Sequence, residues 1–175
     1  METLDPVERK IVIDAINAAE ATYGHKIEHH FCFRNSQILM LADHELPGGS
    51  KSLRYFEGHV VSDQGAAPHA WIEINGKIVD TTLMSSPQGL RVLAKTQYYF
   101  KQEVPPGDVL DYVCVARGKY GSIRRLVLVP RDQISQEAFQ MQQGEALTTE
   151  KPPHRFPTSE VRGPLNTVIA RWAGC

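Results

Sequence analysis

The feature that most constrains the fold of this chain is the pair Asn75-Gly76, which separates two short runs of strand-like composition. Both residues adopt positive φ angles readily, and they suit the two central positions of a type I′ turn, which joins the strands of a tight hairpin. The pair therefore predicts a β-hairpin with arms at 68–74 and 77–82, and it fixes the register of the two arms.

This register brings two chemically active side chains together. Trp71 faces Asp80 and His69 faces Thr82, so His69, Trp71 and Asp80 point to the same side of the hairpin. Diagonal Cβ atoms on one face are roughly 6 to 8 Å apart, which an imidazole and a carboxylate can close into a hydrogen bond. The opposite face carries the apolar residues that we expect to pack on a core, namely Ala70, Ile72, Ile74 and Val79.

Cys32 opens a run whose apolar residues have helical spacing, and the segment 43–49 ends that run. A thiol in the first turn of a helix meets unpaired backbone N–H groups and the positive end of the helix dipole, which lower its pKa. The same N–H groups could hold an oxyanion during acyl transfer. Asn35, about one turn later, and His30, just upstream, are further candidates for lining such a site.

The order of these motifs resembles the core of the transglutaminase-like cysteine enzymes, within the wider papain-like group. The motifs are Cys32 at a helix start, His69-Ala70-Trp71 on one strand and Val79-Asp80-Thr81-Thr82 on the next. The run 53–61 is similar to the strand before the histidine strand in small bacterial and phage members. The resemblance covers about residues 28–83 and implies that Cys32 attacks an acyl carbon, His69 shuttles the proton and Asp80 orients His69.

Two departures from the family pattern concern the reaction outcome. Phe31 precedes the cysteine where well-known members have a small or polar residue, and no upstream glutamine supplies a second oxyanion donor. Hydrolysis and transfer of the acyl group to an amine therefore both remain open. A third alternative is a binding module on the same scaffold, in which the three residues are silent and a groove holds a peptide.

Length and composition agree with a compact domain of ordinary charge. The 175 residues are 42% hydrophobic with a net charge of −1, which is enough for one core and gives no electrostatic footprint for nucleic acid. Without a long apolar run or a signal peptide, we expect a cytoplasmic protein that does not bind membranes. The three cysteines then predict free thiols. We divide the chain into one domain, 1–147, and a proline-rich arm, 148–175.

Trp71, Cys32 and the nearby histidines also have structural interpretations. Trp71 could pack beside the site or form a wall for substrate, and a lone cysteine is more often a buried core residue than a nucleophile. The histidines at 25, 29 and 30 lie near Cys32, but their spacing matches no zinc motif. We therefore expect no metal and no cofactor. The segment 46–52 is predicted to be a flexible turn beside the site.

The remaining elements follow from local signals. Asp5, Pro6 and Glu8 form a capped helix start, and Gly24 ends that helix. Its predicted core stripe is Val7, Ile11, Ala15, Ala18 and Ala19. Further predictions are strands at 51–61 and 97–104, a short apolar strand or buried turn at 125–130, helices at 108–117 and 133–147, a loop at 64–68 and a break at 85–89.

Together these observations predict an α+β fold in which a helix bearing Cys32 packs on an antiparallel sheet that carries His69 and Asp80. The predicted activity is cysteine-dependent acyl transfer from an amide or isopeptide. The expected substrate is a protein, a peptide or a small amide.

Overall fold

The structure, a computed structural model, describes residues 4–62, 65–93, 96–116, 120–126 and 128–130 of the chain. The helices in this part are α1 (Pro6–Tyr23), α2 (Cys32–Glu45), α3 (Thr81–Met84), α4 (Pro87–Leu93) and α5 (Pro106–Val115). The strands are β1 (Arg54–Ser62), β2 (Gly65–Ile74), β3 (Lys77–Val79), β4 (Gln97–Val104) and β5 (Val129–Pro130). The predicted helix 133–147 and the arm 148–175 lie outside the described residues.

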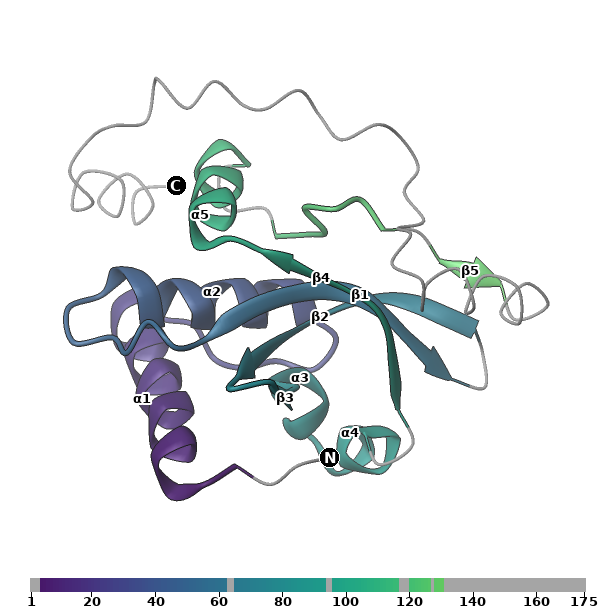
Figure 1. Cartoon of the computed structure of the whole chain (residues 1–175), viewed down its shortest axis with the longest axis horizontal. Helices are drawn as coiled ribbons and strands as arrows, with labels where there is room; N and C mark the ends of the chain where they lie inside the picture. Colours follow the sequence, from purple (N-terminus) through teal and green to yellow (C-terminus); the bar gives the residue numbers. More distant parts are fainter. Residues whose placement is uncertain (1–3, 63–64, 94–95, 117–119, 127, 131–175) are drawn as a thin grey trace.

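The strands form one antiparallel sheet in the order β3-β2-β1-β4, and β5 pairs with the start of β2. Helix α2 lies along this sheet and α1 packs against α2, while α3 and α4 follow β3 (Figure 1). Helices packed on an antiparallel sheet are the α+β arrangement that the sequence predicts.

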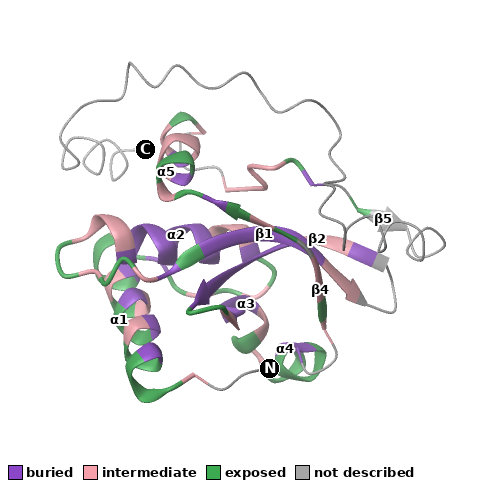
Figure 2. Ribbon diagram, viewed as in Figure 1, coloured by how far each residue is buried: buried purple, intermediate pink, exposed green. Residues whose placement is uncertain are grey.

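Helix α1 begins and ends where its local signals predict. The Asp5 carboxylate accepts a hydrogen bond from the Glu8 backbone N–H at 2.8 Å, and the Glu8 carboxylate accepts one from the Asp5 N–H at 2.8 Å. Gly24 ends the helix with φ of 62°. The predicted stripe was partly wrong, because Val7 is 68% exposed. The buried face of α1 carries Val12, Ala15 and Ala19 (Figure 2).

The hairpin has the predicted turn and register. Asn75 and Gly76 have φ of 50° and 80°, and the pairs are Ile72 with Val79, Glu73 with Ile78, and Ile74 with Lys77. The second arm is shorter than predicted, because β3 ends at Val79 instead of continuing to residue 82. The Asp80 carboxylate accepts a hydrogen bond from the Leu83 N–H at 2.9 Å and so starts α3. A side-chain cap of this kind favours a helix over a continued strand.

Other element boundaries also differ from the predictions. Helix α4 replaces the break at 85–89, because the Ser86 hydroxyl accepts from the Gly89 N–H at 2.9 Å and Pro87 suits a first helical position. Residues 65–68, predicted to be a loop, pair with β1 instead, so strand β2 begins at Gly65. By contrast, the predicted strand 97–104 matches β4, and α5 covers most of the predicted helix 108–117.

The core lies between the sheet and the helices in two adjoining clusters. The first contains side chains of α1, α2, β2 and β3, including Ala15, Ile38, Leu39, Ile72, Ile74 and Val79. The second contains side chains of α2, β1, β2, β4 and α5, including Met40, Leu41, Tyr55, Ala70, Val104 and Val109. Each large aliphatic side chain buried in this way stabilises the fold by about 1.5–3 kcal/mol. The apolar face predicted for the hairpin is therefore a core face.

Two buried carboxylates fasten loops to the core. Asp43, near the end of α2, accepts hydrogen bonds of 2.7–2.8 Å from Ser50 N and Oγ, Ser52 N and Leu53 N. Glu57 on β1 accepts from Tyr55, Ser122, Ile123 and Arg124 at 2.6–2.9 Å. The predicted turn 46–52 thus surrounds Asp43. It was wrongly placed beside the site, since 14 residues of helix separate the two ends of α2 by about 20 Å.

Candidate functional site

Cys32 is the first residue of α2 and is 9% exposed. Phe31 occupies the cap position with φ of −105°, and its side chain makes no capping hydrogen bond. The first helical hydrogen bond runs from the Asn35 N–H to the Phe31 carbonyl at 2.8 Å. The N–H groups of the first turn lie before this bond, so the thiol is at the positive end of the helix as predicted.

His69 lies on β2 and joins the two other residues of the predicted set. Its Nε2 atom lies 2.6 Å from Asp80 Oδ2, and the His69 side chain also hydrogen-bonds to Cys32. The ring is almost fully buried. The hairpin register and the position of α2 therefore bring Cys32, His69 and Asp80 into one connected set of side chains.

The electrostatics of the set favour a charged histidine. Burial lowers the pKa of His69, but hydrogen bonds to Asp80 and Cys32, together with their charges, outweigh burial and raise it to about 10. A carboxylate on one side and a sulfur on the other stabilise the imidazolium. His69 is therefore charged at neutral pH and lies between the Asp80 carboxylate and the Cys32 sulfur.

Asp80 is fully buried and accepts three hydrogen bonds. Its Oδ1 atom accepts from the Leu83 N–H, and its Oδ2 atom accepts from Tyr98 Oη at 2.8 Å as well as contacting His69. The backbone bond fixes the carboxylate at the start of α3. Its orientation toward His69 is therefore set by contacts on both sides.

Tyr98, on β4, is the residue of this set that sequence reasoning missed. Its ring centroid lies 6.3 Å from that of His69, and burial together with the charge of Asp80 raises the pKa of its hydroxyl. The phenol therefore stays protonated and donates to the carboxylate. Its position follows from the pairing of β4 with β1, which no local motif in the sequence signals.

Trp71 packs behind the histidine. It is fully buried, its ring lies nearly parallel to His69 at a centroid distance of 6.4 Å, and it meets the edge of Tyr98 at 4.9 Å. Its indole N–H donates to Glu73 Oε1 at 3.0 Å. Trp71 therefore packs beside the site and restricts the His69 ring, which is the first of the two roles predicted for it.

Asn35 joins α2 to two other segments. Its amide nitrogen donates to the Glu28 carbonyl at 2.7 Å and to Thr82 Oγ1 at 2.8 Å, and its oxygen accepts from the Glu28 N–H at 3.3 Å. The side chain is fully buried. These bonds tie the approach to Cys32 to the segment after Asp80, so Asn35 helps to set the spacing of the site.

The residues just before Cys32 are more open. His30 is exposed with a positive φ of 71°, and its ring centroid lies 4.0 Å from that of His29. The His29 ring lies 3.4 Å from the Thr82 carbonyl. Phe31 is 48% exposed, an unusual position for a large aromatic side chain beside a buried thiol. His30 and Phe31 therefore form the accessible edge of the candidate site.

The other thiol in the described residues is Cys114 on α5. It is half-buried, less than the inert buried thiol that the sequence predicts, and burial and the nearby Asp111 raise its pKa. Within the described ranges, no group of three or more His, Cys, Asp or Glu side chains could hold a metal ion. None of the helices in that part of the chain has the length and apolar character needed to cross a membrane.

Comparisons with known proteins do not assign the chain to a family. No family model matches it, and neither the curated proteins nor the solved structures contain a match. The chemistry of the site must therefore be argued from its own geometry.

Proposed function

We propose that this protein is a cysteine-dependent acyl-transfer enzyme in which Cys32 is the nucleophile, His69 the acid and base, and Asp80 the residue that orients His69. The observation that carries the proposal is the position of His69, which hydrogen-bonds to Cys32 and lies 2.6 Å from Asp80. The same set supports the transglutaminase-like resemblance of residues 28–83. The proposed substrate is an amide or isopeptide of a protein or peptide.

The proposed reaction has two steps. The Cys32 thiolate attacks the carbonyl carbon, a carbon–sulfur bond forms, and the amine leaves with a proton from His69. Water or a second amine then attacks the thioester while His69 takes its proton, and the thiolate departs. The N–H groups at the start of α2 are placed to stabilise the oxyanion of both steps, because no side chain of the described residues caps them.

The first test measures the reactivity of Cys32. Iodoacetamide labelling of the full chain, followed peptide by peptide across pH, should show fast labelling of Cys32 at pH 6 and slow labelling of Cys114. Cys114 is an internal control, since burial raises its pKa. In His69→Ala the fast reaction of Cys32 should disappear while that of Cys114 is unchanged. Equal, ordinary rates for both thiols would point instead to a silent binding module.

A second test follows the acyl group itself. With p-nitrophenyl acetate, the wild type should release nitrophenol in a burst and gain an acetyl group on the Cys32 peptide, and Cys32→Ser should show no thioester. An added primary amine separates the two outcomes that the sequence leaves open. Faster turnover with formation of the acetylated amine indicates a transferase, whereas unchanged release of acetate indicates a hydrolase.

A further inference from the structure

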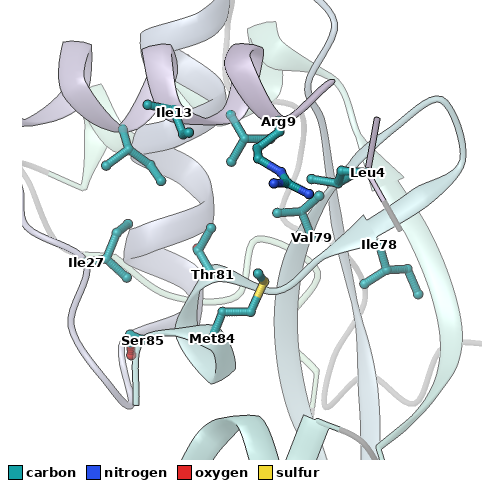
Figure 3. A pocket seen from close by; sticks show the side chains of 11 residues that line it. Leu4, Arg9, Ile13, Ile27, Ile78, Val79, Thr81, Met84 and Ser85 are labelled. Atoms are coloured by element: carbon teal, nitrogen blue, oxygen red, sulfur yellow. The ribbon is translucent and has the colours of Figure 1, made fainter. Parts of the chain in front are cut away.

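A cavity of about 760 Å³ lies between α1 on one side and β3 and α3 on the other (Figure 3). This volume falls in the range of small-molecule sites. Most of the wall is aliphatic, with side chains that include Val12, Ile13, Ile16, Ile27, Val79 and Met84. Cys32, His69 and Asp80 do not line it, so the cavity is a separate feature of the molecule.

Three polar residues line this apolar cavity, namely Arg9, Thr81 and Ser85, and the Ser85 hydroxyl already donates to the Thr82 carbonyl at 2.7 Å. Arg9 extends from α1 toward Leu4 and Val79, and Thr81 lies on the α3 side of the cavity (Figure 3). Within the described residues, the Arg9 guanidinium has no carboxylate partner. Thr81 is only 7% exposed, and its buried hydroxyl has no hydrogen-bond partner in the described part of the chain. A buried hydroxyl without a partner is unfavourable. Its oxygen is covered in this structure, so a bound carboxylate reaches it only after the Thr81 side chain rotates.

We propose that this cavity binds a free medium-chain fatty acid, with its aliphatic tail along the apolar wall and its carboxylate at Arg9 and Thr81. A guanidinium without a carboxylate partner among the described residues matches one negative charge, and its planar fork suits a carboxylate. The Thr81 hydroxyl supplies a further donor. Ile13 and Met84, at the wall, are 48% and 47% exposed, and a tail bound there would cover apolar surface that now contacts water.

The proposal does not depend on the acyl-transfer activity. Thr81 directly follows Asp80, so the cavity and the candidate active site share helix α3. Binding is nevertheless measurable without catalysis. Cys32→Ser should bind the fatty acid as the wild type does, and this variant separates failure of the binding proposal from failure of the proposed function.

The test is calorimetric titration of the full chain with decanoate, together with hexanoate, octanoate and 1-decanol. We expect one saturable site and an affinity that rises about three- to four-fold for each added CH₂ until the tail fills the cavity. Decanol, which lacks the charge, should bind at least about ten-fold more weakly. Absence of saturable decanoate binding overturns the proposal.

Two matched variants test the polar groups. Arg9→Gln should reduce decanoate affinity about ten-fold or more and abolish the preference over decanol. Lys10→Gln is the control, because it removes the same charge from the next residue, which does not line the cavity and pairs with Asp14 at 2.5 Å. Equal losses in the two variants would show a general charge effect and overturn the assignment of the carboxylate.

Thr81→Val tests the hydroxyl without changing the size of the side chain. The unliganded variant should melt at the same temperature as the wild type or higher, because a buried hydroxyl without a partner is lost. Its decanoate affinity should fall several-fold.

The alternative occupant is a second copy of the chain. If the protein self-associates, Ile13→Asp breaks the dimer and decanoate does not bind, the cavity is a dimer contact and the proposal is overturned.

Discussion

A buried carboxylate lies at each end of helix α2, and the two differ in the groups that donate to them. Asp43, at the C-terminal end, accepts four hydrogen bonds from backbone N–H groups and a serine hydroxyl, none of which titrates near neutral pH. Asp80, beside the N-terminal end, accepts from a histidine, a tyrosine and one backbone N–H. The first carboxylate holds the turn 46–52, with the His44 ring at 4.0 Å, whereas the second is hydrogen-bonded to a histidine that also contacts a thiol.

The comparison shows that burial of a carboxylate does not by itself indicate a functional site. At Asp43 the donors are fixed by the chain, and the bonds define the loop 46–52. At Asp80 the histidine donor has a second contact with Cys32, so a change at the carboxylate can affect the Cys32 thiol. The hydrogen-bond partners of a buried carboxylate therefore indicate whether its role is structural or functional.

The largest expected effect is the pH dependence of stability at the Asp80 end. The pKa of His69 is raised from 6.5 to about 10 in the folded protein, so its stabilising contribution is complete below pH 6.5 and is lost as pH rises toward 10. Urea unfolding should show that the free energy of unfolding of the wild type exceeds that of His69→Gln most at pH 6.5. This excess should shrink by on the order of 3–5 kcal/mol as the pH rises to 10. A difference that stays constant from pH 6 to 10 would contradict the raised pKa.

The next effect concerns stability at the other end of the helix. Asp43→Asn should lower the free energy of unfolding by about 3 kcal/mol, because an amide group then faces the donors of Ser50, Ser52 and Leu53. Chemical denaturation measures this loss. The alkylation rate of Cys32 in the folded variant should stay within about two-fold of the wild type. A large fall in that rate would mean that the two ends are coupled.

The complementary substitution is Asp80→Asn. It removes the charge that holds His69 protonated, and we expect iodoacetamide labelling of Cys32 at pH 6 to slow by about 100-fold, or about 2.7 kcal/mol. The folded state should persist, since the amide oxygen can still accept from the Leu83 N–H. Unchanged labelling in a folded variant would show that Asp80 has only a capping role at α3.

The smallest effect is expected from Tyr98→Phe. The phenol donates to the same carboxylate oxygen that contacts His69, so its removal leaves the Asp80 charge in place but less well oriented. Labelling of Cys32 should slow by about five-fold. The pH midpoint of the His69 titration should shift upward, because Oδ2 of Asp80 then interacts with His69 alone. NMR titration of the imidazole measures this shift. Tyr99→Phe is a matched control, because the Tyr99 hydroxyl donates to Gln97 instead.

The sequence by itself determined the features that depend on neighbouring residues. The positive φ angles of Asn75 and Gly76 fix the hairpin register, and the Asp5 and Glu8 caps fix the start of α1. These features require only local backbone geometry and hydrogen bonds within a few residues, which the order of residue types specifies. The placement of His69 relative to Asp80 follows from the same local rule.

The tertiary structure decided the features that join distant segments. The Tyr98 contact with Asp80 depends on the pairing of β4 with β1, and the burial of Asn35 depends on Thr82, 47 residues further along the chain. The end of β3 at Val79 was also unpredicted, because the Asp80 side chain was assigned to one partner while it also caps α3. Such contacts depend on how the sheet and helices pack. The chain entropy lost in forming them is offset by burial of the whole core and not by neighbouring residues. No local sequence pattern therefore reveals them.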